Sequence, residues 1–431
     1  MLKQRWLVIA RSFDVNAKAE SLWLRRADTW QFVFLLLVLT SANLSIAVSQ
    51  ISMGAALALL FCKGFIWRQW PPKTGLEAPA IALALWALIM IPFSADSGQS
   101  AIFYRRFFLF SILWVAASLA TTERRRYILA AAALAGAVAV SLVCEIQIFQ
   151  RAGGLFTTRF MGASNSMTSG VLLMMAVLVG LSFLVVLKDQ RKWRIVITAM
   201  VLLITLAMFQ TMTRSAIMGL MAGIAAMILL VRPRVFIVFL LIIVLATVLI
   251  YSLGEQIVPH RFWIRISPEA MVDSTSSTGL RVEMWRGGWE MFKAQPIIGV
   301  GDCDLTKLVP EYYGDQTTRY FGHMHSNVVM WAVIWGVPGL IISHWFVLLP
   351  LVVLIPRLRL LLAKPGGLKR DPSRAAWVLA ATAVLVGFYV AGLTEWYFGD
   401  AEAMSLYLSI IGIGLGQKVP TENTPDTANG Q

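Results

Sequence analysis

Residues 193–253 read WRIVITAMVLLITLAMFQTMTRSAIMGLMAGIAAMILLVRPRVFIVFLLIIVLATVLIYSL. Three apolar runs in this stretch are separated by two short polar breaks, at 211–214 and 232–234. A helix needs about 20 apolar residues to cross about 30 Å of hydrocarbon, and each run approaches or reaches that length. The stretch therefore predicts three consecutive membrane-spanning helices.

The rest of the chain has the same character. Of its 431 residues, 58% are hydrophobic and 14% are charged, whereas a soluble globular chain carries about 25% charged residues. The predicted fold is an all-α polytopic membrane protein with about twelve transmembrane helices. These spans are expected at 30–47, 48–66, 78–93, 101–120, 127–150, 164–188, 193–209, 213–231, 235–253, 328–356, 374–394 and 402–417.

This composition excludes several classes of protein. It argues against a soluble enzyme fold and against nucleic-acid binding as the meaning of the formal net charge of +14. Three cysteines are too few for a disulfide-built secreted scaffold. No small-residue cleavage site follows the first apolar stretch, so no removable signal peptide is expected.

Lysine and arginine predict the orientation. With the N-terminus in the cytoplasm, 25 of the 37 basic residues fall in cytoplasmic segments, as the positive-inside rule requires. The predicted organisation is a cytoplasmic N-terminal segment at 1–29, transmembrane helices 1 to 9 at 30–253, a large periplasmic loop at 254–327, transmembrane helices 10 to 12 at 328–417 and a cytoplasmic tail at 418–431.

Twelve basic residues remain on the predicted outer side, and ten of them are arginine. They are Arg105, Arg106, Arg151, Arg159, Arg214, Arg261, Arg265, Arg281, Arg286, Lys293, Lys307 and Arg319. Guanidinium forks onto phosphate in a bidentate way, so this set indicates an anion site on the outer side. The alternative is that individual arginines reach to the membrane interface or form loop salt bridges.

The large loop at 254–327 is far longer than most connections, which favours a functional segment. Within it, 281–293 predicts an amphipathic helix with Trp285, Trp289 and Phe292 on one face. We expect this helix to lie on the outer leaflet with its arginine face toward lipid head groups.

Two of the four histidines, His323 and His325, lie near the end of this loop. A histidine at the mouth of a span can act as a general base near neutral pH. A His-x-His pair can also bind a metal, but no third ligand of fitting spacing stands beside it in the sequence. The nearby Asp302-Cys303-Asp304 resembles the Asp-x-Asp of metal-dependent sugar-nucleotide transferases, but a loop turn after Gly299 and Gly301 is the favoured interpretation.

From His325 the chain reads HSNVVMWAVIWGVPG, which is His-Ser, nine residues and then Gly-x-x-Gly. This pattern resembles the O-antigen ligase and O-antigen polymerase superfamily, the bacterial enzymes that share the Wzy-C region. Further similar segments are RFMGASN at 159–165, TRSAIMGL at 213–220 and RVEMWRGGWEMFKAQPIIGVG at 281–301. The resemblance covers roughly 150–410. In one departure, Met218 stands where the family often has leucine.

The resemblance implies a transferase of the glycosyltransferase-C structural class that acts in lipopolysaccharide biosynthesis. Such an O-antigen ligase moves polysaccharide from undecaprenyl pyrophosphate to a sugar hydroxyl of lipid A-core. The reaction takes place on the periplasmic face of a Gram-negative inner membrane and inverts the anomeric carbon. No metal or other cofactor is expected, and the predicted partners are the lipid-linked donor, lipid A-core and membrane lipids, without nucleic acid.

Site residues follow from this chemistry. A diphosphate is already a good leaving group, so the enzyme chiefly needs positive charge on it in a partly dehydrated site. We predict that Arg214 and Arg281 are catalytic and clamp the diphosphate, with Arg159 and Arg286 as further binding candidates. His325 is predicted to take the proton from the acceptor hydroxyl, the alternative being a capping or packing histidine.

Several other positions carry weaker signals. Glu145, Gln147 and Glu395 are expected to pair with an arginine or to receive an acceptor sugar. The Gly-x-x-Gly segment with its central Pro338 predicts a helix break that positions His325. Trp396 and Tyr397 are typical of an interfacial aromatic belt.

Three rival functions stay open at this point. An O-antigen polymerase and a protein O-oligosaccharyltransferase use the same donor chemistry with different acceptors. A twelve-span secondary transporter is the alternative from outside the enzymes. It is disfavoured because transporters carry polar residues near mid-membrane with repeat symmetry, whereas here the polar residues gather on one side.

Overall fold

The computed structural model describes residues 2–150, 159–162, 165–256, 263, 276–313, 322–363 and 371–416, with side chains from residue 22 onward. Every secondary-structure element in this part of the chain is helical. The longer α-helices are α1 Leu2–Ser41, α2 Ile46–Trp67, α3 Glu77–Met90, α6 Glu123–Gln150, α7 Ser166–Val186, α8 Arg191–Gln210, α9 Arg214–Val231, α10 Pro233–Leu253, α13 Ser277–Ala294, α15 Asn327–Ala363, α17 Pro372–Gly392 and α18 Ala401–Leu415. The shorter helices are η1 Ile91–Phe93, α4 Ser97–Phe103, η2 Tyr104–Phe110, α5 Ser111–Leu119, η3 Gly254–Gln256, η4 Leu305–Lys307, α14 Val309–Tyr313 and η6 Tyr397–Gly399.

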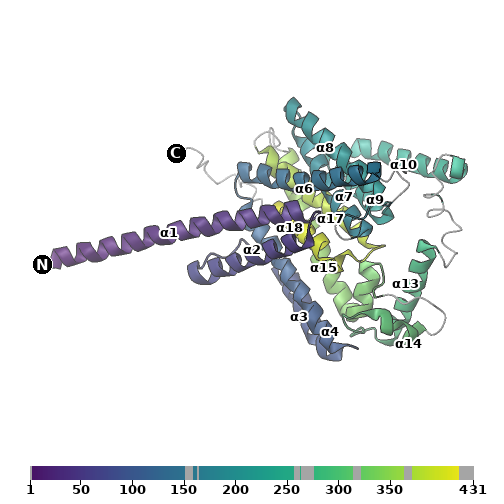
Figure 1. Ribbon diagram of the computed structural model, residues 1–431, viewed down its shortest axis with the longest axis horizontal. Helices are drawn as coiled ribbons and strands as arrows, with labels where there is room; N and C mark the ends of the chain where they lie inside the picture. The colour runs from purple at the N-terminus through teal and green to yellow at the C-terminus, as the bar shows by residue number, and fades with distance from the viewer. Residues whose placement is uncertain are drawn as a thin grey trace.

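The chain is a polytopic membrane protein. Within the described residues, nine helices are long and apolar enough to cross a membrane, when the continuous run of α4, η2 and α5 over Ser97–Leu119 is taken as one, and they coincide with nine of the predicted spans. The other three predicted spans fall on the C-terminal part of α1 and on two shorter apolar helices, Glu77–Phe93 and Ala401–Leu415. The expected division of the first pair is confirmed, because α1 ends at Ser41 and α2 begins at Ile46. In Figure 1, α1 projects far beyond the other helices toward the N-terminus.

Two helices form the centre of the bundle. α7 and α17 are largely buried and pack against each other, and α9 and α18 also contact α17. At the other extreme, α10 has no buried residue and lies at the edge of the molecule (Figure 1). A helix that is apolar all round suits a lipid environment when it lies at the edge and a protein core when it lies at the centre.

A close backbone contact joins α9 to α17. A Cβ atom added to Gly219 would lie 2.5 Å from the carbonyl oxygen of Gly387, so both positions require a residue without a side chain. Small residues allow such close approach between membrane helices. The contact sets the first residue of α9, Arg214, beside the end of α17, and Glu395 follows α17 within three residues.

The predicted helix break in α15 is confirmed at Gly336, whose backbone is non-helical at φ 63° and ψ −165°. The break releases the carbonyls of Val333 and Ile334, which accept hydrogen bonds from the amides of Val300 (2.8 Å) and Gly301 (3.1 Å). The amide of Val337 donates in turn to the carbonyl of Pro296 at 2.8 Å. The segment at 281–301 and the segment that begins at His325 both resemble the Wzy-C family, and main-chain hydrogen bonds join them here.

Replacement of Gly336 by alanine is expected to destabilise the protein by about 1–3 kcal/mol or more, because its backbone region is open essentially to glycine alone. The added Cβ would also lie 2.2 Å from the carbonyl oxygen of Ile297. Thermal unfolding of the detergent-purified protein measures the effect. The control is Gly54→Ala on α2, where an added Cβ meets nothing within 4 Å. Equal melting temperatures for the two variants would contradict the prediction.

Candidate active site

The segment from Gly322 to Asn327 leads into α15 and carries both candidate histidines. The indole Nε1 of Trp285 on α13 donates to the carbonyl of Met324 at 2.9 Å. At the other end of the segment, the side-chain oxygen of Asn327 accepts from the amide of Phe398 at 3.0 Å. His325 between them has a positive φ of 43°, which is uncommon for a residue with a side chain. Anchors on both sides hold it in this conformation.

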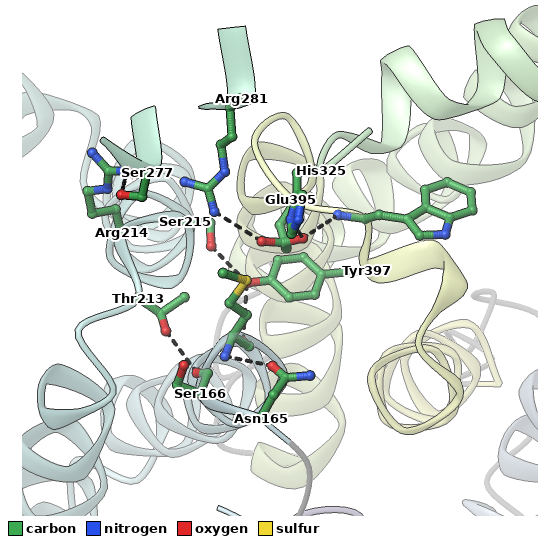
Figure 2. A network of polar contacts seen from close by, with 12 residues as sticks. Asn165, Ser166, Thr213, Arg214, Ser215, Ser277, Arg281, His325, Glu395 and Tyr397 are labelled. Carbon is green, nitrogen blue, oxygen red and sulfur yellow. Dashed lines mark hydrogen bonds and ion pairs between the residues drawn. The ribbon is translucent and has the colours of Figure 1, made fainter. Parts of the chain in front are cut away.

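His325 and Arg281 meet at one carboxylate. Glu395 lies 2.5 Å through Oε1 from Nδ1 of His325 and 3.1 Å through Oε2 from a terminal nitrogen of Arg281. Figure 2 shows the carboxylate of Glu395 between the side chains of Arg281 and His325. The expectation that Glu395 pairs with an arginine is therefore confirmed, and the histidine is an additional partner.

This pairing determines which imidazole nitrogen is available for chemistry. Burial raises the pKa of Glu395, but the hydrogen bond and charge of His325 and the charge of Arg281 outweigh it, so the pKa lies below its ordinary value. An ionised carboxylate only accepts hydrogen bonds, so Nδ1 of His325 carries the proton. When the ring carries this proton alone, Nε2 is the basic nitrogen, which is the arrangement of a general base oriented by a carboxylate.

His323 lies against His325, with ring centroids 4.2 Å apart. Its Nδ1 accepts a hydrogen bond from the amide of His325 at 3.3 Å. Burial, with the charge of His325, lowers the pKa of His323 to about 4. His323 is therefore neutral near pH 7 and supports the loop as a hydrogen-bond acceptor.

Three arginines surround a small cavity of about 70 Å³. Arg159, Arg214 and Arg281 line it, with Met212, Thr213, Met167 and Ser277. Arg214 donates to the hydroxyl of Thr278 (2.6 Å) and to that of Ser277 (3.2 Å), which joins the start of α9 to the start of α13 (Figure 2). Arg159 donates through Nε to the carbonyl of Thr211 at 2.8 Å. Arg214 and Arg281 were predicted to clamp the diphosphate, and Arg159 was a further binding candidate.

A second, larger cavity of about 340 Å³ adjoins the first. It is lined by Arg159, Asn165, Ser166, Met167, His323, His325, Glu395, Trp396 and Asp400. Arg159 and Met167 line both cavities, so the two spaces are neighbours. The arrangement can bind an anion among guanidinium groups and, beside it, a hydroxyl compound that faces an imidazole base.

The local sequence explains how α7 contributes to both cavities. Asn165 caps α7, because its side-chain oxygen accepts from the amides of Met167 and Thr168, each at 2.8 Å. The hydroxyl of Thr213 donates to the carbonyl of Ser166 at 2.8 Å, which ties the start of α7 to the residue before α9. The segments at 159–165 and 213–220, which both resemble the Wzy-C family, therefore meet at the site.

The predicted position of α13 needs a correction. The helix exists and extends the predicted 281–293 slightly at each end. Its arginine face was expected to point toward lipid head groups, but Arg281 points to Glu395 and packs inside the protein with 14% of its side chain exposed. The face of α13 that carries Trp285 and Gly288 packs on the start of α15. α13 thus brings an arginine to the site.

A second correction concerns Trp396 and Tyr397, which were expected in an interfacial aromatic belt. Both are buried, at 7% and 0% exposure. Tyr397 donates to the carbonyl of Met167 (3.2 Å) and its hydroxyl lies 2.8 Å from that of Ser215 (Figure 2). Tyr397 therefore ties the start of α7 to the start of α9.

The other predicted residues lie outside the two cavities. Arg286 is exposed on α13, and its role as a diphosphate ligand stays a prediction. Glu145 accepts a hydrogen bond from Gln210 at 3.3 Å and forms no ion pair with an arginine in the described part of the chain, and Gln147 is half-buried on α6. Four of the outer arginines, Arg151, Arg261, Arg265 and Arg319, lie outside the described residues.

The Asp-x-Asp segment is part of the loop structure. Asp302 is buried and pairs with Arg106 at 3.1 Å. Burial raises the pKa of Asp302, and the charge of Arg106 offsets this rise only in part. Asp304 instead accepts from the amide of Thr306 at 2.9 Å, which caps η4. The turn interpretation of this tripeptide is the one the contacts support.

A third metal-ligating group, absent from the neighbouring sequence, is supplied by the fold. His323, His325 and Glu395 each bring one ligand atom within 4.8 Å of the others. However, Glu395 already binds Nδ1 of His325 and the guanidinium of Arg281, whose positive charge opposes a cation there. The donor set therefore fits a divalent metal poorly, and metal independence stays a prediction.

Sequence reasoning missed two carboxylate roles. Glu395 was singled out for its position at the end of a span, but nothing in the sequence linked it to His325, 70 residues earlier. Asp400 was not singled out, although an aspartate just before an apolar helix is a recognisable N-cap signal. Thr168, which donates to Asp400 at 2.6 Å, lies three residues after Asn165 and was likewise missed.

A comparison with protein families adds an independent finding. Residues 199–343 match the family model described as O-antigen ligase. The match includes Arg214, Arg281 and His325, and it covers about a third of the chain, less than the predicted 150–410. Arg159, Glu395 and the rest of the larger cavity lie outside it. The chain matches no curated protein by sequence similarity.

Proposed function

Since the chain carries an O-antigen ligase domain of the Wzy-C family at residues 199–343, we propose that it transfers a polysaccharide from undecaprenyl pyrophosphate to a sugar hydroxyl of lipid A-core. One observation carries this proposal. A cavity lined by three arginines adjoins a cavity lined by a carboxylate-bound imidazole. Transfer from a lipid diphosphate to a hydroxyl needs a group of each kind, side by side.

The proposed location is the periplasmic face of a Gram-negative inner membrane. The positive-inside distribution of lysine and arginine supports this orientation, since the site residues lie at the predicted outer ends of the spans. The proposal includes the glycosyltransferase-C fold class that the family resemblance implies. In this orientation the arginines of the site and the polysaccharide lie on the same side of the membrane.

On the donor side, the arginines stabilise the departing diphosphate. As the bond from the anomeric carbon to the phosphate oxygen breaks, negative charge grows on that oxygen. Arg159, Arg214 and Arg281 offer forked N–H groups to it from three separate chain segments. Their positions are set by packing before the donor binds, so little reorganisation is needed at the moment of reaction.

On the acceptor side, His325 supplies the base. Nε2 takes the proton of the acceptor hydroxyl while the hydroxyl oxygen forms a bond to the anomeric carbon on the face opposite the diphosphate. The bond to phosphate breaks, undecaprenyl pyrophosphate leaves, and the configuration inverts. Glu395 stabilises the imidazolium that results, because it already binds Nδ1 at 2.5 Å.

The experiment that tests this proposal is an in vitro transfer with the purified full chain, lipid-linked polysaccharide and lipid A-core, run with and without a metal chelator. Product on lipid A-core at an unchanged rate in chelator is the expected result. Loss of product in chelator, with recovery on adding a divalent ion, would contradict metal independence and would make His323, His325 and Glu395 the first candidate ligands.

The same assay separates the rival functions. Elongation of the lipid-linked chain without product on lipid A-core would replace the ligase by a polymerase, and transfer to an added serine- or threonine-containing protein would replace it by a protein O-oligosaccharyltransferase. Absence of transfer to all three acceptors would reject the proposed activity.

A further inference from the structure

Part of the larger cavity has no role in the steps described above. Trp396 and Asp400 line it, and Asp400 is the residue just before α18. The volume of about 340 Å³ lies at the lower end of the range of about 300–1,000 Å³ for small-molecule sites. A carboxylate at the wall of such a cavity suits a sugar ring, which presents hydroxyls at its edge.

Asp400 occupies the N-cap position of α18, yet its side chain does not cap the helix. An aspartate there usually accepts a hydrogen bond from an amide of the first turn. The carboxylate turns instead to the hydroxyl of Thr168 on α7, which donates to Oδ2 at 2.6 Å. The side chain is thus fixed at the cavity wall by α7, and α18 is left without a side-chain cap at its first turn.

The Asp400 carboxylate favours a hydroxyl group over an anion as its contact. Within the described part of the chain, no lysine or arginine forms an ion pair with this carboxylate, and Thr168 is its side-chain hydrogen-bond partner. Burial raises the pKa of Asp400 to about 6; the nearby charges of Glu402 and Glu395 add to the rise, while the Thr168 bond and the charge of Arg106 oppose it. A phosphate oxygen in contact with this carboxylate, on the part of the cavity wall away from Arg159, would be repelled by it, whereas a sugar hydroxyl can donate to it.

Resting on the proposed function, we infer that the larger cavity binds the acceptor as an uncharged sugar ring, with Asp400 accepting a hydrogen bond from one hydroxyl while His325 faces another. Both residues line this one cavity, and they reach it from different segments of the chain. Two hydroxyls of one ring held in this way present a single oxygen to the base. Asp400 is then an acceptor-binding residue that determines which hydroxyl reacts.

Asp400→Asn tests this inference, because the amide keeps the size of the side chain and an oxygen that accepts from Thr168 but loses the charge. Transfer kinetics of the purified full chain are measured while acceptor and donor are varied separately. The KM for lipid A-core is expected to rise about tenfold, the size typical of a lost hydrogen bond to a charged group, with the donor KM within about twofold of the wild-type value. The matched control is Glu402→Gln, a buried carboxylate two residues away that does not line the cavity, and it should match the wild type.

A second readout separates acceptor binding from a merely structural role. Lipid A-core that carries a phosphate on its accepting sugar should show a KM about tenfold above that of the unphosphorylated acceptor with the wild type, and Asp400→Asn should narrow this gap. An unchanged acceptor KM in Asp400→Asn, or equal rises in donor and acceptor KM, would overturn the inference.

Failure of the proposed function is recognised separately, in the wild-type reaction. If the wild type elongates lipid-linked chains or modifies a protein instead of lipid A-core, the ligase assignment fails. The same variants are then compared with the acceptor that is used, and Asp400 must still affect the KM for that acceptor alone. Wild-type protein that binds no hydroxyl acceptor at all, measured without donor, would overturn the inference directly.

Discussion

Replacement of His325 by alanine is expected to lower kcat by about 10²- to 10⁴-fold, the range that a positioned general base contributes. The KM for the lipid-linked donor should change little, because His325 lines the larger cavity and is absent from the lining of the arginine cavity. Single-turnover transfer by the purified variant measures the chemical step, and binding of undecaprenyl pyrophosphate alone measures donor affinity.

The control for this prediction uses the carboxylate partner of His325. Glu395→Gln removes the charge that orients Nδ1, and it should slow the wild type but have little further effect on His325→Ala, because Glu395 acts on the proton transfer through His325. Since Glu395 also pairs with Arg281, donor binding is measured in both backgrounds. Independent, additive losses in kcat would contradict the proposed base, as would near-normal transfer by His325→Ala.

The membrane spans could be predicted because the signal is local. Each span is a continuous apolar run, and the breaks between runs are visible as short polar segments. The break at Gly336 was predictable for the same reason, since glycine and proline mark backbone that leaves the helix. What the sequence does not contain is the partner of this break, the main chain of Val300 and Gly301.

The arginines of the site were predicted by type and position, but their orientation depends on tertiary contacts. Arg281 looked equally suited to lipid head groups, because an amphipathic helix has the same pattern on a membrane surface and against a protein. The docking of Trp285 on Met324 turns this helix inward. The buried Tyr397 was misassigned in the same way, since aromatic residues after a span occur both at interfaces and in sites.

The pairing of His325 with Glu395 lay beyond sequence reasoning because it depends on helix packing. Glu395 follows α17, and the close contact of Gly219 with Gly387 sets α17 against α9. Arg214, at the start of α9, and Glu395 are therefore brought to one end of the bundle by two glycines within the spans. Spacing along the chain carries no information about such contacts.

Replacement of Arg214 by alanine is expected to reduce kcat/KM for the donor by about 10²- to 10³-fold, the loss typical when one preorganised donor to a developing negative charge is removed. The variant should bind undecaprenyl pyrophosphate more weakly and keep the wild-type KM for lipid A-core, because Arg214 lines the arginine cavity and is absent from the lining of the larger one. Lysine at this position keeps the charge but loses the fork, so Arg214→Lys should recover only part of the activity.

Arg214 also binds α13, so the loss of this structural contact must be separated from the loss of charge. Thr278→Val removes the hydroxyl to which Arg214 donates at 2.6 Å but leaves the guanidinium in the cavity wall, and it should retain most of the donor affinity. Arg105→Ala, an exposed arginine on η2, is the matched control for charge removal and should behave as the wild type. If Thr278→Val lost as much donor affinity as Arg214→Ala, docking of α13 would account for the defect and the diphosphate role would be rejected. If Arg214→Ala, Thr278→Val and Arg105→Ala all bound the donor normally, the diphosphate would bind elsewhere. The arginine cavity beside His325 would then not be the donor site of the reaction.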